Sequence, residues 1–113
     1  MKIGVTSQNF RTITGHAGKT RRFLVYEADA QGNLREIDRL DLPREMAMHE
    51  FHGEHHPLFD LDVLITASCG EGFVRRLAQQ GVQVIATSES DPLTAVKRIL
   101  EGAPLPPPQP HGH

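Results

Sequence analysis

Histidine is the residue whose placement in this sequence most clearly suggests chemistry. Four of the seven histidines lie close together, and they are His49, His52, His55 and His56. Imidazole nitrogen binds Fe, Zn, Ni and Cu, so such a group could supply most of a metal site. If residues 44–56 form a short helix, His49, His52 and His56 share one of its faces. The alternative is an irregular, solvated segment whose histidines bind nothing.

A further candidate ligand, His16, stands in the string GHAGKT between Gly15 and Gly18. Glycine leaves the backbone sterically free, which lets the imidazole come close to a ligand. Basic residues follow that could stabilise an anionic group, and they are Lys19, Arg21 and Arg22. The alternative is a histidine on a surface loop. The string does not fit a phosphate-binding P-loop, because two residues rather than four separate its glycines and a strand follows instead of a helix.

The single cysteine, Cys69, follows a continuous apolar run and precedes Gly70 and Gly72. A position near the start of a helix would lower the pKa of its thiol and favour the thiolate, a soft ligand for iron–sulfur species. Backbone N–H groups of the glycine turn could also bind an anion. The alternative is a small buried apolar side chain. Nothing in the sequence pairs Cys69 with a histidine, as a hydrolase would require, and one cysteine excludes a disulfide within the chain.

The pattern of apolar residues predicts the elements that must position these side chains. Five strands are predicted, over residues 2–6, 22–27, 34–42, 62–67 and 82–87. Helical spacing predicts one helix from Phe73 to Gly81 and another from the N-cap Asp91 to Gly102. The order predicts an α/β fold, in which a hairpin and a right-handed parallel crossover form a mixed five-stranded sheet with flanking helices.

The same order predicts where a ligand would bind and where the domain ends. Ligands collect beyond the C-terminal ends of parallel strands, where the loop 7–20 and the turn 68–72 are expected. Residues 1–102 are predicted to form one domain. Residues 103–113 are rich in proline and are predicted to be an extended, mobile tail, whose deletion would leave the melting temperature nearly unchanged.

Length and charge exclude several classes of protein. The chain has 113 residues and a formal net charge of −2. No apolar run is long enough to cross a bilayer, and the N-terminus is too poor in apolar residues for a signal peptide, so we expect a cytoplasmic protein. The chain lacks the broad basic face that nucleic-acid binding needs. It also lacks the His-Glu-x-x-His pattern of zinc proteases. We therefore expect neither a membrane nor a nucleic-acid partner.

Taken in order, the motifs resemble one known family. They are KIGVTS, the GHAG string with FLVYEAD, HEFHGEHHPL, LITASCGEGFVRRLAQQGVQVIAT and DPLTAVKRILEG. Over residues 2–102 the sequence resembles the dinitrogenase iron–molybdenum cofactor-binding and biosynthesis family. The resemblance implies a fold similar to ribonuclease H. An actual ribonuclease is disfavoured, because its paired metal ions need several carboxylates and the first strand offers none.

The resemblance also implies a site and a role. The family's His-Phe-Gly loop matches residues 16–18, with Ala17 in place of the aromatic residue, and its Gly-x-Gly turn matches residues 70–72. The role implied is that of a non-enzymatic carrier of an iron–sulfur or iron–molybdenum-type cluster, with His16 as a direct ligand. We expect the histidines of residues 49–56 to act as auxiliary ligands on a mobile flap. The remaining cofactor-binding residues expected are Gly18, Lys19, Arg21, Arg22, Cys69, Gly70 and Gly72.

Two other functions stay open on the sequence alone. The histidine segment could bind or buffer a divalent metal such as Zn or Ni. The chain could also be a regulatory interaction module without a cofactor. For the carrier, the expected partner is a cluster-assembly or acceptor protein, and the chain is expected to be a monomer or a weak homodimer. The sequence does not decide whether His111 and His113 join a metal site.

Overall fold

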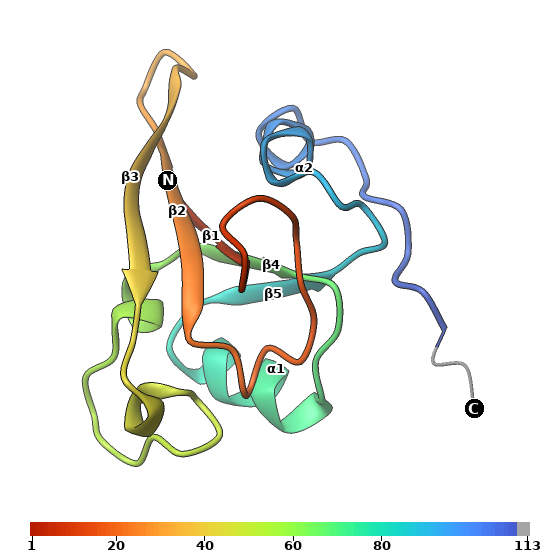
Figure 1. Cartoon of the computed structure of the whole chain (residues 1–113). Coiled ribbons are helices and arrows are strands. Elements are labelled where there is room, and N and C mark those ends of the chain that lie inside the picture. The colour runs from red at the N-terminus through yellow and green to blue at the C-terminus, as the bar shows by residue number, and fades with distance from the viewer. Residues whose placement is uncertain (111–113) are drawn as a thin grey trace.

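The computed structural model describes residues 1–110, which form one five-stranded sheet and several helices (Figure 1). The strands are β1 (Lys2–Thr6), β2 (Arg22–Ala28), β3 (Leu34–Asp41), β4 (Val63–Thr66) and β5 (Gln83–Ala86). The α-helices are α1 (Glu71–Gln79) and α2 (Pro92–Leu100), and two short 3-10 helices are η1 (Arg44–Met46) and η2 (Pro57–Asp60). In this described part of the chain, no helix is long and apolar enough to span a membrane. His111 and His113 lie outside it.

The sheet is mixed, as the sequence predicts. Its strand order is β3-β2-β1-β4-β5. The pairs β1–β4 and β4–β5 are parallel, whereas β1–β2 and β2–β3 are antiparallel. The predicted α/β architecture of a five-stranded sheet with flanking helices is therefore confirmed. β5 differs from the prediction in one respect, because it is the edge strand and is only partly buried.

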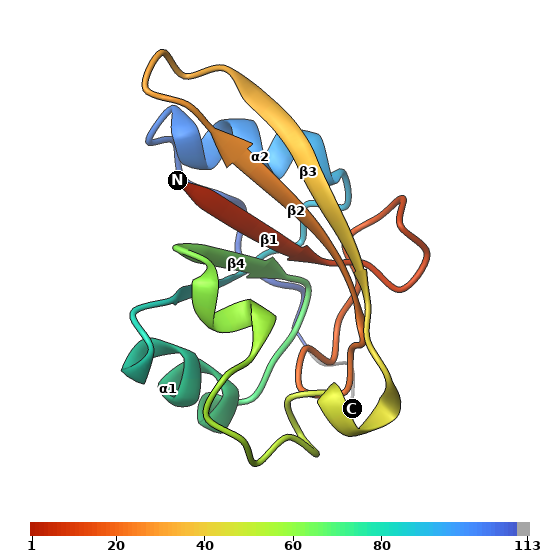
Figure 2. The ribbon, with the colours of Figure 1, turned by 90° about the vertical axis from the view of Figure 1, so that its left-hand side faces the viewer.

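Alternating side chains give the sheet two apolar faces, and each face packs against one α-helix. Ile3, Val5 and Ile65 belong to the core that includes Ala95 and Val96 of α2. The alternate residues of the strands, such as Val25 and Leu64, point to the opposite face of the sheet. There they pack with α1 and with the segment from Met48 to Leu61. Figure 2 shows α1 and α2 on opposite sides of the sheet. A strand has a side-chain period of two, so burial on both faces explains its continuous apolar runs.

Buried threonines fix the loops at the C-terminal ends of β1 and β4. Thr6 and Thr66 have no exposed surface, and their hydroxyl oxygens lie 2.9 Å apart. The carbonyl of Thr14 accepts from the Thr6 hydroxyl at 2.5 Å and from the Ala67 N–H at 3.1 Å. The loop after β1 is therefore tied to the turn after β4. This contact brings the two predicted ligand-binding loops together.

The segment 44–56 forms no α-helix, so of the two alternatives that the sequence left open, a short helix or an irregular segment, the structure has the second. Only the single turn η1 is helical, and the chain then continues irregularly to His56. His49, His52 and His56 therefore do not share a helix face. The segment is also held more firmly than a mobile flap would be, because Met48, Phe51 and Leu58 are buried in the core beside α1. Burial of these side chains thus outweighs the helix propensity of the residues at the start of this segment.

The proline-rich segment is extended, as its composition predicts, but its first residues contact the domain. The Thr87 hydroxyl donates to the carbonyl of Pro106 at 2.7 Å, and the Ser88 N–H donates to that of Pro107 at 3.1 Å. Leu105 packs against the core beside α2. Residues 103–107 thus contact the domain, where we expected an extended, mobile tail.

We expect deletion of residues 103–113 to lower the free energy of unfolding by about 1–2 kcal/mol, because the hydrogen bonds to residues 103–107 and the apolar contact of Leu105 are lost. The melting temperature should fall by about 5 °C or more. Deletion of residues 108–113 alone is the matched control and should change it little. Thermal unfolding followed by circular dichroism measures both. Equal melting temperatures for the longer deletion and the full chain would contradict the docking of this segment.

Candidate functional site

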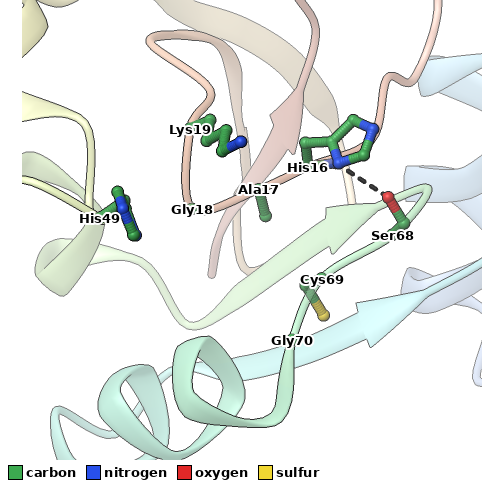
Figure 3. A pocket seen from close by; sticks show the side chains of 8 residues that line it. All are labelled: His16, Ala17, Gly18, Lys19, His49, Ser68, Cys69 and Gly70. Atoms are coloured by element: carbon green, nitrogen blue, oxygen red, sulfur yellow. Dashed lines mark hydrogen bonds between the residues drawn. The ribbon is translucent and has the colours of Figure 1, made fainter.

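A pocket of about 330 Å³ lies where the loop after β1 meets the turn after β4. We call it the His16 pocket. Its wall consists of residues 16–19, His49 and residues 68–70. Figure 3 shows that these residues come from three separate stretches of chain around one opening. The predicted meeting of both loops at the carboxyl edge of the parallel strands is thus found.

The His16 loop is fixed by Ser68. The His16 N–H donates to Ser68 Oγ at 2.8 Å, and the Ala17 N–H donates to the Ser68 carbonyl at 3.1 Å. His16 has a φ of 55°, a left-handed conformation that is costly for a residue with a Cβ, so surrounding contacts must hold it. A Cβ at Gly15 would overlap Ser68 Oγ, so a larger residue there would displace the hydroxyl that accepts the His16 N–H. Ser68 is therefore a positioning residue for His16.

His49 is held at the same pocket by hydrogen bonds from its segment to the loop after β1 and to α1. The His49 N–H donates to the carbonyl of Gly18 at 2.7 Å. The Arg76 guanidinium on α1 donates to the carbonyl of Met48 at 2.8 Å and to that of Phe51 at 2.6 Å. Arg76 therefore clamps the backbone on both sides of His49. The sequence offered no signal for this role, since the two partners are 28 and 25 residues from Arg76.

Cys69 is half-buried in the pocket wall, immediately before the start of α1. Its partial burial raises the pKa of the thiol, because a thiolate is poorly solvated there. The expected lowering of this pKa by the helix is therefore not found, and Cys69 is a neutral thiol at neutral pH. Gly70 caps α1 without a side-chain hydrogen bond. A bound metal would displace the thiol proton, since metals bind the thiolate.

The basic residues after His16 do not all serve this pocket. Lys19 lines it, whereas Arg21 lines a neighbouring pocket. Arg22 points elsewhere, with its Nε 3.4 Å from an Asp41 oxygen and its guanidinium carbon 5.4 Å from the centre of the Phe10 ring. The expectation that Arg22 contacts the ligand is therefore not met by its position. Lys19 is the one of the three that can attract a negatively charged ligand directly into the His16 pocket.

The other histidines of the 49–56 segment lie away from the His16 pocket. His52 and His55 are exposed. His56 is buried, and both of its ring nitrogens are engaged: Nε2 lies 2.7 Å from the Met46 carbonyl and Nδ1 accepts the Leu58 N–H at 3.1 Å. His56 is thus a structural residue that stabilises η2, where the sequence suggested a metal ligand. Gly72 borders a pocket beside Arg76 rather than the His16 pocket.

Within residues 1–110, no three His, Cys, Asp or Glu side chains come together as a group that could hold a metal ion. His49 lies on one side of the His16 pocket, and His16 and Cys69 lie on the other (Figure 3). A single zinc ion needs its ligands within about 2.0–2.3 Å, so donors so spread out do not form a preformed zinc site. The arrangement suits a ligand that spans the opening.

Fold and site together define a small α/β domain with a ligand pocket at the carboxyl edge of its parallel strands. The sequence matches the family described as "Dinitrogenase iron-molybdenum cofactor" over residues 1–102. The chain therefore belongs to this family, as its motifs predict. Membership associates it with the iron–molybdenum cofactor. None of the curated proteins matches the sequence.

Solved structures share the fold at low sequence identity. PH0822 aligns with a TM-score of 0.66 and 12% identity, covering 91% of this chain and 93% of that one. A Methanocaldococcus jannaschii protein, mj0327, provisionally described as a dinitrogenase, aligns with a TM-score of 0.62 and 11% identity over 90% and 89% of the two chains. The Thermotoga protein TM1290, provisionally described as a NifB protein, has a TM-score of 0.57 and 16% identity over 98% of each. These likenesses support the fold.

Proposed function

We propose that the chain is a non-enzymatic carrier of an iron–sulfur or iron–molybdenum-type cluster, which binds in the His16 pocket. One observation carries the proposal: His16, His49 and Cys69, from three separate segments, line one cavity together with Lys19. Nitrogen and sulfur donors of these kinds bind iron. The family association supports the same class of cargo.

The spacing of the donors favours a cluster over a single ion. A cluster exposes several metal atoms on a body larger than one ion, so donors around a cavity can each bind a different atom. A cavity of about 330 Å³ leaves room for such a body. Lys19 and the free N–H groups at the start of α1 add positive potential for an anionic cluster.

The same features suit transfer rather than catalysis or permanent storage. Few donors and an open pocket allow the cargo to leave, since each lost ligand lowers the barrier to release. The expected partners are proteins that assemble the cluster or accept it. The cargo is the substrate of this transfer, and the chain contributes binding and orientation.

Anaerobic transfer of a pre-made iron–sulfur cluster to the full chain tests the proposal. We expect visible charge-transfer absorption to appear on binding. His16→Ala and Cys69→Ser should each weaken binding about tenfold or more, because each removes a donor. His52→Ala is the matched control, since His52 is exposed and lies outside the pocket. Equal absorption in all four proteins would contradict the assigned site.

Titration with zinc separates the other two functions. Tight, colourless zinc binding that survives His16→Ala but not His52→Ala would indicate a divalent-metal protein that uses the histidine segment. Absence of both cluster and zinc binding would indicate an interaction module. Either result would overturn the carrier function.

A further inference from the structure

A second pocket of about 600 Å³ adjoins the His16 pocket and is lined by basic side chains. We call it the Arg21 pocket. Lys19, Arg21 and Arg44 contribute three positive charges, and Glu50 contributes one negative charge. The pocket shares Lys19 and His49 with the His16 pocket, so the two cavities meet along one wall. Its lining has a formal charge of +2, although the whole chain carries −2.

The β2–β3 hairpin brings the two arginines to the same place. Arg22 pairs with Asp41 at the end of the ladder, and the Leu42 N–H donates to the carbonyl of Arg21 at 2.9 Å. Arg44 follows two residues later, at the start of η1. Both positions are therefore set by backbone pairing. The loop after β1 supplies Lys19 independently.

Gln8 adds a neutral donor to this pocket. Its Oε1 accepts the N–H groups of Arg21 and Arg22, both at 3.2 Å. Because the oxygen is engaged with two backbone donors, the amide nitrogen is the atom left for other partners. The pocket is thus rich in donors, with the Glu50 carboxylate as its main acceptor.

The three cations are also not neutralised by the protein. None of the ion pairs formed among residues 1–110 includes Lys19, Arg21, Arg44 or Glu50. Arg22, next in the chain, shows the contrast, because it lies beside Asp41. Like charges gathered at one cavity repel one another, and an anion bound between them removes that repulsion.

We propose that the Arg21 pocket binds a small oxyanion with two or more negative charges, either phosphate or a polycarboxylate. Guanidinium groups match carboxylate and phosphate oxygens through paired N–H donors, and the net charge of the lining complements a dianion. The site does not depend on the cluster. It goes beyond the carrier function, because its ligand is a separate anion held at the neighbouring wall.

Isothermal titration of the full chain without cluster, with citrate and with phosphate in low-salt buffer, tests this site. We expect at least one of the two anions to bind. The anion with the lower Kd shows whether the site prefers phosphate or carboxylate oxygens. Arg21→Gln and Arg44→Gln should each raise its Kd about tenfold. Arg35→Gln is the matched control, because Arg35 is an exposed arginine at the far end of the same hairpin. It should leave the Kd unchanged.

Three results would overturn the site. The first is no heat of binding for either anion with the full chain. The second is an equal loss in Arg35→Gln, which would show attraction to net charge alone. The third is loss of anion binding in Cys69→Ser, which would place the anion in the His16 pocket. The first two results do not bear on cluster binding, since Arg21 and Arg44 do not line the His16 pocket. The cluster-transfer assay is run separately, so failure of the anion site and failure of the carrier function can be told apart.

Discussion

Replacement of His56 by alanine is expected to lower the free energy of unfolding by about 3–4 kcal/mol. The two ring nitrogens of His56 make its side-chain hydrogen bonds: Nε2 donates to the Met46 carbonyl and Nδ1 accepts the Leu58 N–H. It also packs edge-on against Phe51, with ring centroids 4.8 Å apart. Removal leaves a cavity, the buried Leu58 N–H without its acceptor and the half-buried Met46 carbonyl without its donor, and these costs add.

Denaturant unfolding measures this loss, and His55→Ala is the matched control. His55 is the adjacent residue and is exposed, so its replacement should change stability by less than about 0.5 kcal/mol. Similar losses for both variants would show that His56 does not stabilise η2.

The same residue makes stability depend on pH. Burial lowers the pKa of His56 below 6.5, the Met46 carbonyl partly offsets this, and the positive charge of Arg76 adds to the lowering. At pH values between 6.5 and the lower pKa of His56 in the folded state, the unfolded chain therefore binds more protons than the folded chain. The stabilisation is complete above pH 6.5 and falls as the pH drops through that window. His56→Ala should show a weaker fall than the natural chain over this range, and an identical pH profile would contradict the assignment.

Replacement of Arg76 by methionine is expected to lower the free energy of unfolding by about 2–3 kcal/mol. Methionine keeps much of the apolar stem but removes both charge-assisted hydrogen bonds to the carbonyls of Met48 and Phe51. It also removes the cation from above the Phe51 ring, whose centre is 5.6 Å from the guanidinium carbon. Because these carbonyls flank His49, we expect cluster binding in the His16 pocket to weaken as well.

Arg75→Met is the control for this change. Arg75 is the preceding residue of α1, its side chain is 74% exposed, and its nearest acidic partner lies 4.0 Å away. An exposed pair of this kind contributes little, so Arg75→Met should leave stability within about 0.5 kcal/mol. Chemical denaturation and the cluster-transfer assay test both variants. Unchanged stability in Arg76→Met would show that the segment does not depend on this clamp.

The strands and the α-helices could be predicted because their signals are local. Alternating or continuous apolar runs determine which strand faces are buried, and the sheet follows them closely. The Asp91-Pro92 pair is a second case, since the Asp91 carboxylate accepts the Thr94 N–H at 2.9 Å at the start of α2. The loops at residues 7–20 and 68–72 could be placed together from strand order alone.

The histidine segment could not be predicted in the same way. Its spacing fits one helix face, yet the helix does not form, because burial of Met48, Phe51 and Leu58 determines its path. Its four histidines consequently separate: His49 joins the His16 pocket, His56 enters the core, and the other two are exposed. The tail likewise gains contacts that its composition does not indicate.

The sequence by itself determined the order of elements, the mixed sheet, the family and the candidate ligands His16 and Cys69, because these depend on local patterns and motifs. Only the tertiary structure decided which histidine accompanies them, that Arg76 and Ser68 position the pocket, and that Arg21 and Arg44 face a separate cavity. Those pairings join residues 23 to 52 positions apart. Such contacts depend on how the layers pack around the sheet, and no short stretch of sequence contains that information.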